Sequence, residues 1–238
     1  MHSVAAVLKS QPQRLLRVHA QKERHDARLQ QLLDELQSAN ISILREPQKK
    51  LDKMVVGNHQ GIIAECALKQ DYKEDYLDDL AKQHGKKLFL LVLDGVTDPH
   101  NLGACLRTAE AAGVHAVVVP RDNSASINST VSKVAAGAAE LVPLIVVTNL
   151  ARTLRQLQEL GVWVMGAAGE AVQSLYDAKL QKPMALVLGA EGGGLRRLTR
   201  ETCDDLLAIP MPGKTSSLNV SVATGVCLFE IVRQNTSH

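Results

Sequence analysis

The chain has 238 residues, enough for one small and one medium domain, and 45% of them are hydrophobic. Only 3% are aromatic, so the core must be aliphatic, and an RNA-binding surface built from stacked aromatic rings is not expected. The net charge of +2 is too small to indicate a nucleic-acid partner. Residues 1–68 carry 10 Lys and Arg against 7 Asp and Glu, which favours this part for binding an anion.

The four cysteines show neither C-x-x-C spacing nor a pair of histidines that would complete a zinc pattern. They are Cys66, Cys105, Cys203 and Cys227. Reduced, partly buried thiols are the plain interpretation. The first residues lack the charged-then-apolar pattern of a secretion signal, and no apolar run approaches the length of about 18 residues that a membrane span needs. The sequence therefore predicts a cytoplasmic protein without a metal site.

Residues 1–68 have the pattern of a small α/β domain. Four leucines fall on one face of a 3.6-residue period, which predicts an amphipathic helix over residues 25–40. Strands are expected at residues 14–20, 41–44 and 62–67. Residues 69–87 are charged and bounded by turn residues, so we interpret them as a linker with a short, solvated helix around Tyr76, Leu77 and Leu80.

Residues 88–238 show a regular alternation of apolar strands and helical patterns. The strands are expected at residues 88–93, 114–119, 144–147, 162–165, 184–188 and 206–209. Helices over 102–112 and 150–160 each end at a glycine, Gly113 and Gly161, the residue type that most often follows a helix. Continuous aliphatic strands alternating with helices predict a parallel α/β sheet covered on both faces.

Polar segments follow three of these strands, where open α/β sheets bind their ligands. In the first, residues 93–113, Asn101 is expected to cap the following helix, and Arg107 lies about two turns in. Capping alone would explain Asn101, and a surface helix charge would explain Arg107. The helix neighbours of Arg107 are small, which indicates that something large packs against that face.

The second segment, residues 186–198, has three glycines that free backbone N–H groups to approach a ligand, with Glu191 among them. It fails as a dinucleotide-binding fingerprint, because an acid stands where the second glycine belongs. The third, residues 209–226, lacks the first glycine of a phosphate loop, since Ala208 stands there. Ser217 and Asn219 precede its helix, and ordinary helix capping would also explain them.

These three segments, in this order, resemble the signature motifs of the SpoU branch of the SPOUT RNA methyltransferases. The front part resembles the small domain, similar to ribosomal protein L30e, that members of this family carry, including the stretch Asn58-His-Gln-Gly-Ile-Ile-Ala64. The likeness is greatest to members that make 2′-O-methylguanosine in 23S ribosomal RNA. Those members usually begin with a short Tyr-Gly-Ile/Arg-His stretch, whereas this chain begins Met1-His2, so its first strand could be shortened.

The resemblance implies residues 1–68 as an RNA-binding domain, 69–87 as a linker and 88–238 as a methyltransferase domain whose carboxy-terminal segment makes a deep trefoil knot. S-adenosylmethionine would sit in the knot, held largely by backbone. The implied cofactor-binding residues are Gly189, Ile209, Met211 and Leu218, and the implied catalytic residues are Asn101, Arg107, Glu191, Ser217 and Asn219. A homodimer that acts without a metal is also implied, with 23S ribosomal RNA or a ribosomal precursor particle as its partner.

The implied roles follow from the chemistry of each side chain. A guanidinium has a pKa above about 12, so Arg107 is expected to clamp the phosphate and hydroxyl of the target nucleotide, and direct proton abstraction stays an alternative. Asn101 would hold the ribose or Arg107, and Glu191 would orient Arg107 or a loop N–H. Ser217 and Asn219 would shape their loop and contact RNA. Three other functions stay open: a transfer-RNA ribose methyltransferase of the same branch, a non-catalytic RNA-binding assembly protein and, more distantly, a nucleotide-dependent oxidoreductase.

Overall fold

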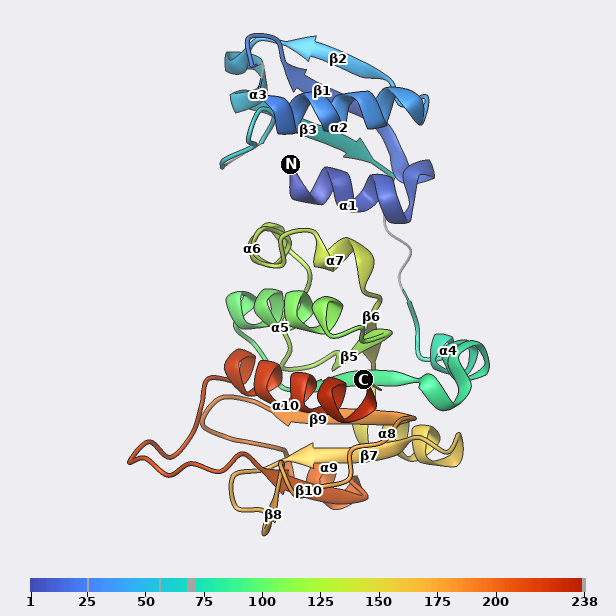
Figure 1. Cartoon of the computed structure of the whole chain (residues 1–238), viewed down its shortest axis with the longest axis vertical. Helices are drawn as coiled ribbons and strands as arrows, with labels where there is room; N and C mark the ends of the chain where they lie inside the picture. Colours follow the sequence, from blue (N-terminus) through green and yellow to red (C-terminus); the bar gives the residue numbers. More distant parts are fainter. Residues whose placement is uncertain (25, 56, 68–71, 237–238) are drawn as a thin grey trace. The chain divides into compact units, whose positions relative to one another are not determined.

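The computed structural model describes residues 1–24, 26–55, 57–67 and 72–236, and it divides into two compact units. Unit 1 comprises Met1–Gln70 with Ala136–Leu141, and unit 2 comprises Asp71–Ala135 with Val142–His238 (Figure 1). The expected boundary at residue 68, the first residues of the expected linker and residue 25 of the expected helix lie outside the described residues. No helix within the described part of the chain is long and apolar enough to cross a membrane.

Unit 1 is built on a three-stranded sheet in the order β2-β1-β3. The central strand β1 runs parallel to β2 and antiparallel to β3. The helix α2 buries the four expected leucines, Leu29, Leu32, Leu33 and Leu36, and the Asp26 side chain caps it by accepting from the Leu29 N–H. The elements are α1 (His2–Ser10), η1 (Pro12–Arg14), β1 (Leu15–Gln21), α2 (Ala27–Ser38), β2 (Ile43–Glu46), α3 (Gln48–Met54), β3 (Ile62–Cys66) and α7 (Ala138–Leu141).

Unit 2 contains a seven-stranded, entirely parallel sheet in the order β6-β5-β4-β9-β7-β10-β8. The strands are β4 (Phe89–Asp94), β5 (Ala116–Pro120), β6 (Leu144–Val147), β7 (Trp163–Ala167), β8 (Gln173–Ser174), β9 (Met184–Gly189) and β10 (Asp205–Ala208). The helices are α4 (Tyr76–His84), η2 (Gly85–Lys87), α5 (Pro99–Ala111), α6 (Ser129–Val134), α8 (Leu150–Glu159), α9 (Arg197–Thr202) and α10 (Val220–Asn235). The parallel α/β sheet expected from the alternating pattern is confirmed.

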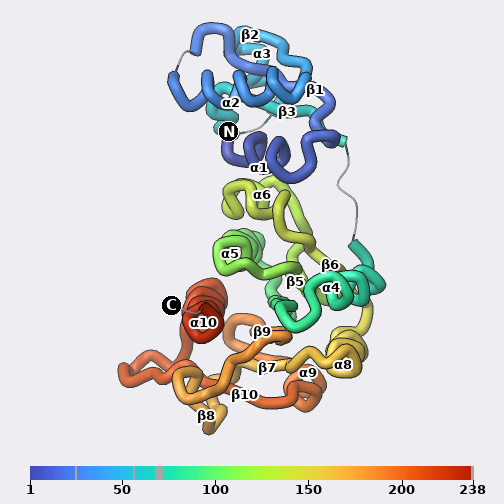
Figure 2. The backbone as a smooth tube through the Cα atoms, turned by 45° about the vertical axis from the view of Figure 1, so that its right-hand side comes forward, coloured from blue at the N-terminus to red at the C-terminus, as the bar shows by residue number. Residues whose placement is uncertain are grey.

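Helices cover both faces of this sheet, as Figure 2 shows, with α5 and α10 on one face and α4, α8 and α9 on the other. The strands β4, β5 and β9 are aliphatic and buried along most of their length, because a sheet covered on both faces has no solvent side. Gly113 and Gly161 have positive φ values of 72° and 78°, as expected for residues that end helices.

The helix α4 corrects the prediction of a solvated linker helix. Leu77 and Leu80 are 0% and 3% exposed, and they pack in the same cluster as Leu90 of β4 and Leu154 of α8. The charged residues that suggested a solvated helix lie on its outer face. The helix is therefore amphipathic, with an apolar face that its overall composition does not reveal. Residues 76–84 therefore belong to the core of unit 2.

Candidate active site

The site begins where β4 and β9 end side by side in the middle of the sheet. Asp94 and Gly189, the last residues of the two strands, are paired in register. Because all strands of the sheet are parallel, the loops that follow β4, β9 and β10 leave from the same edge. The three polar segments singled out in the sequence therefore lie at one edge, as ligand sites in such sheets do.

The loop after β9, here called the glycine loop (residues 189–195), is a tight turn closed by its own backbone. The Ala190 N–H donates to the Gly194 carbonyl at 3.1 Å, and the Gly194 N–H donates back to the Ala190 carbonyl at 3.0 Å. Gly192 and Gly194 have φ values of 75° and 63°, which favour glycine. A Cβ at Gly189 would lie 2.0 Å from the Gly194 carbonyl carbon, so no side chain fits at the first position.

An ion pair joins the end of the glycine loop to β4. Asp94 is 0% exposed, and its Oδ1 accepts from Arg196 Nε and Nη2, both at 2.5 Å. Its Oδ2 accepts from the Arg196 backbone N–H at 3.0 Å. A buried carboxylate requires such partners, and Arg196 satisfies it with its side chain and its backbone together. Neither Asp94 nor Arg196 was singled out as a site residue from the sequence.

Asn219 joins the three segments. Its Nδ2 donates to Asn101 Oδ1 at 3.1 Å and to Glu191 Oε1 through a very short contact. Its Oδ1 accepts from the Ser221 N–H at 2.8 Å and caps α10, as the capping interpretation expected. A single amide therefore uses its oxygen to start a helix and its nitrogen to connect the other two loops.

Two predicted contacts are corrected by this arrangement. Asn101 does not cap α5, because the helix begins at Pro99 and Asp98 is its cap, accepting from the His100 N–H at 2.9 Å. Asn101 is instead 7% exposed and faces Asn219. Within the described part of one chain, the partner of Glu191 is the Asn219 amide, in place of the expected Arg107 or loop N–H. The signal for the cap was Asp98-Pro99, an N-cap followed by proline at the first helical position.

The small residues of α5 let α10 approach it closely. The Thr108 methyl lies 3.9 Å from where a Cβ of Gly225 would stand, and Cys105 Sγ lies 3.4 Å from Thr224 Oγ1. Burial raises the pKa of the Cys105 thiol to about 11, so this cysteine is not a nucleophile at neutral pH. The large neighbour expected from the small residues of α5 is therefore α10.

The remaining predicted residues stand apart from the Asn219 contacts. Arg107 is exposed on α5 and forms none of the ion pairs made by the described residues. Ser217 is exposed in the segment between β10 and α10, and Leu218 is 36% exposed. Ile209 and Met211 are half-buried just after β10. Among the described residues no group of His, Cys, Asp and Glu side chains could hold a metal ion.

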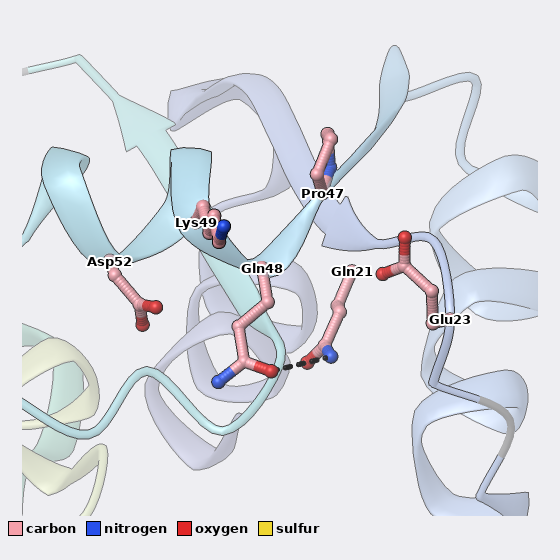
Figure 3. A pocket seen from close by; sticks show the side chains of 6 residues that line it. All are labelled: Gln21, Glu23, Pro47, Gln48, Lys49 and Asp52. Atoms are coloured by element: carbon pink, nitrogen blue, oxygen red, sulfur yellow. Dashed lines mark hydrogen bonds between the residues drawn. The ribbon is translucent and has the colours of Figure 1, made fainter.

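Unit 1 has a shallow cavity of its own, with a volume of about 560 Å³. It lies at the carboxyl ends of the parallel strands β1 and β2, and Figure 3 shows the amides of Gln21 and Gln48 meeting in its middle. The Gln21 Nε2 donates to Gln48 Oε1 at 3.3 Å. Glu23, Pro47, Lys49 and Asp52 complete the lining. This mixture of amides and charges suits a polar ligand.

Comparison with known families covers almost the whole chain. Residues 88–229 match the SpoU rRNA Methylase family, and residues 1–72 match the family described as RNA 2′-O ribose methyltransferase substrate binding. The chain belongs to the SpoU rRNA methylase family. The three motifs that meet at Asn219 all lie within residues 88–229, so the SpoU match covers every candidate catalytic residue.

Curated relatives in the SpoU rRNA methylase family are similar over their full length. The protein named 23S rRNA (guanosine-2'-O-)-methyltransferase RlmB in Vibrio parahaemolyticus is 59% identical, across 98% of this chain and 95% of its own. The protein of the same name in Photorhabdus laumondii is 60% identical, across 100% of this chain and 97% of its own. The match therefore includes both units.

Solved structures in the SpoU rRNA methylase family show the same fold. AviRb from Streptomyces viridochromogenes, crystallised with the cofactor AdoMet, aligns with a TM-score of 0.79 at 20% identity, covering 98% of this chain and 87% of its own. The TrmH/SpoU tRNA modifying enzyme from A. aeolicus aligns with a TM-score of 0.56 at 31% identity, covering 68% of this chain and 83% of its own. The first likeness shows the fold alone.

Proposed function

We propose that this protein transfers a methyl group from S-adenosylmethionine to the ribose 2′-hydroxyl of a guanosine in 23S ribosomal RNA. The observation that carries the proposal is the 59–60% identity, over nearly the whole of both chains, to relatives named for that reaction. Local geometry supports it, because the glycine loop and the Asn101, Glu191 and Asn219 side chains converge at the carboxyl edge of the parallel sheet.

S-adenosylmethionine would be held by Gly189, Ile209, Met211 and Leu218. The lack of space for a Cβ at Gly189 lets the loop fold back tightly on its own backbone at the end of β9, and Ile209 and Met211 offer half-buried apolar surface after β10 at the same edge of the sheet. The bound cofactor supplies an already activated methyl group. The protein's task is then to orient the ribose hydroxyl in line with that methyl group and to stabilise the charge that develops.

Arg107 would clamp the phosphate next to the target ribose and stabilise the hydroxyl oxygen as its proton leaves. A guanidinium keeps its charge in proteins, so electrostatic stabilisation is the role that its chemistry favours. Within one chain Arg107 forms no ion pair among the described residues, and it lies beside the helix face on which α10 packs. We assign it to the site of a second copy in a homodimer.

The site would contain three side chains that hydrogen bonds hold in place, those of Asn101, Glu191 and Asn219. The carboxylate of Glu191 and the carbonyl oxygen of Asn101 both accept from the Asn219 Nδ2, which holds the three loops at one spacing. Because the contact with Asn219 uses the Asn101 oxygen, the Asn101 amide N–H groups would donate to the ribose. Ser217, exposed just before Asn219, is suited to contact the RNA.

Unit 1 would act as an L30e-like RNA-binding domain formed by residues 1–68. Its family match is described as substrate binding, and the cavity around Gln21 and Gln48 offers donors and acceptors for RNA groups. We further propose that the segment after β10, which leaves the sheet edge and returns to pack α10 on α5, closes the trefoil knot of the SPOUT fold. Because the substrate is ribosomal RNA, the protein would act in the cytoplasm.

The test is to map 2′-O-methyl groups in 23S ribosomal RNA from cells with and without the protein. We expect one guanosine to lose its methyl group and to regain it when the purified protein and S-adenosylmethionine are added to unmethylated RNA or precursor particles. Loss of a methyl group from transfer RNA instead would favour the transfer-RNA alternative. Unchanged methylation of both RNAs would contradict an enzymatic role and favour an assembly protein.

A further inference from the structure

Both ends of the glycine loop are attached to one residue, Asp94. The loop begins at Gly189, which pairs with Asp94 in the β4–β9 ladder. The residue directly after the loop is Arg196, whose backbone N–H, Nε and Nη2 all donate to the Asp94 carboxylate. A single side chain at the end of β4 therefore acts together with the Ala190–Gly194 backbone hydrogen bonds to set the separation of the loop ends.

The attachment depends on charge as well as on hydrogen bonds. Asp94 is completely buried, whereas the Arg196 side chain is 48% exposed. A buried carboxylate is costly without a cation, so it holds the guanidinium in place even though solvent reaches one side of it. Arg197, the next residue, is 85% exposed, and among the described residues it pairs with Glu201 one turn along α9. Of these two adjacent arginines, only Arg196 is tied to the site.

The loop that this pair holds carries two features that the proposed reaction uses. Gly189 and the Ala190–Gly194 backbone pair form the part of the loop that would lie near the cofactor in the proposed function. Glu191 accepts from Asn219, which in turn donates to Asn101. A shift at Arg196 would therefore move the backbone near the cofactor and the carboxylate near the ribose at the same time.

We infer that Asp94 and Arg196 are a positioning pair that sets the glycine loop for cofactor binding and for methyl transfer. The inference rests on the proposed function, because it assigns the two residues to the same site. Neither residue needs to touch a substrate. They act by holding Gly189 and Glu191 at the spacing that the site requires, and small misplacements of this kind can cost about 10²-fold in rate.

The experiment compares Arg196→Ala, Arg196→Lys and the matched control Arg197→Ala in the full-length protein. Three quantities are measured well below each melting temperature: amide hydrogen exchange of residues 189–196 without cofactor, the Kd for S-adenosylmethionine by calorimetry, and single-turnover methyl transfer to RNA. A double variant, Asp94→Asn with Arg196→Ala, leaves no buried carboxylate unpaired and keeps the test valid if Arg196→Ala alone does not fold.

We expect Arg196→Ala, or the double variant, to speed exchange at Ala190 and Gly194, to weaken cofactor binding about tenfold or more, and to slow methyl transfer about 10²-fold. Arg196→Lys should restore the melting temperature more than the Kd, because it returns the charge without the planar fork. Arg197→Ala should match the wild type. A lower melting temperature with unchanged exchange, Kd and rate would overturn the inference. Absence of cofactor binding by the wild type would instead contradict the proposed function, leaving the exchange result to decide the inference.

Discussion

Arg107 is exposed on α5 and takes no part in the Asn219 contacts, so its proposed catalytic role depends most on a direct test. Arg107→Ala should leave the Kd for S-adenosylmethionine within about twofold and lower single-turnover methyl transfer about 10²–10³-fold, the usual value of preorganised charge. The measurement pairs calorimetry with radiolabelled methyl transfer to unmethylated 23S RNA.

Arg107→Lys separates the two roles that the sequence left open. Lysine keeps the charge but loses the bidentate fork, so a phosphate clamp predicts a rate almost as low as that of Arg107→Ala. Lysine also has the lower pKa, so proton abstraction predicts recovered activity that grows as pH rises. Wild-type rates in Arg107→Ala would remove this residue from the mechanism and leave it as a surface charge.

Asn219 caps α10 with its oxygen and connects two loops with its nitrogen, and these two functions can be separated by mutation. Asn219→Asp keeps a side-chain oxygen that caps α10, and Asp is about as good a cap as Asn. The same change removes the donor to Asn101 and Glu191 and places two carboxylates against each other. We expect a change of only a few degrees in the melting temperature, but loss of methyl transfer by about 10²-fold or more.

Asn128→Asp is the matched control for that variant. Asn128 caps α6 through its bond to the Val131 N–H, and no contact with Asn101 or Glu191 is recorded for it within the described chain. Both variants should be similarly stable in thermal unfolding. If Asn128→Asp loses as much activity as Asn219→Asp, the loss is a general effect on helix caps and the proposed role of Asn219 fails.

At the scale of elements, the glycine loop is the part of the site most sensitive to added volume. Gly189→Ala would place a Cβ 2.0 Å from the Gly194 carbonyl carbon, so the loop must shift. Gly193→Ala is a matched control, because nothing lies within 4 Å of its Cβ position and its φ is not in the left-handed region. We expect only Gly189→Ala to abolish calorimetric binding of S-adenosylmethionine. Equal affinities in the two variants would contradict a cofactor site at this loop.

Six of the seven strands of unit 2 could be predicted to within about two residues, because burial on both faces demands unbroken aliphatic runs. The short strand β8 at the edge of the sheet was missed, because its residues Gln173 and Ser174 are polar. The start of α5 could not, because Asp98 and Asn101 are both good caps and the sequence does not show which is used. The helix α1 was missed, since its apolar residues are small and mixed with polar ones. Short apolar patterns of that kind do not fix an element by themselves.

The residues of the site were predictable by type, and their contacts were not. Asn101, Glu191 and Asn219 stood out as polar side chains after strands, and the structure brings them together. Arg196 did not stand out, because an arginine next to another arginine has the pattern of a solvated helix start. Only the buried position of Asp94 distinguishes Arg196 from Arg197, and burial at a strand end is a property of the folded sheet.

At the scale of the whole molecule, α10 presents apolar side chains that its own unit leaves uncovered. Val222 and Phe229 are 52% and 50% exposed, and their spacing of seven residues places them on one face of the helix. Gly225 lies between them along the helix and is close to Thr108 of α5. Thr108 is the neighbour of Arg107 in the sequence. We expect a homodimer through this face, with light scattering giving about twice 25.7 kDa. Phe229→Glu should shift the protein to the monomer, whereas Val172→Glu, at an already fully exposed position, should not. A wild-type monomer at micromolar concentration would contradict the prediction.

Unit 2 should be able to fold without residues 1–70, but not without α4. Sequence composition put a linker at residues 69–87, yet Leu77 and Leu80 of α4 are buried in the core of unit 2. A chain starting at residue 71 should therefore fold and bind S-adenosylmethionine. A chain starting at residue 88 loses both leucines, at a cost of about 2–5 kcal/mol for each, which is a large share of the stability of a domain.

Thermal unfolding and calorimetry of the two truncated proteins provide the measurement. The chain from residue 71 should keep the cofactor affinity of the full-length protein and lose affinity for 23S RNA, because the basic unit 1 is absent. The chain from residue 88 should unfold at a markedly lower temperature, and Leu77→Ala with Leu80→Ala in the full-length protein should reproduce most of that loss. Equal melting temperatures for the two truncations would mean that α4 contributes nothing to the core. Undiminished RNA affinity in the chain from residue 71 would assign RNA binding to unit 2 alone.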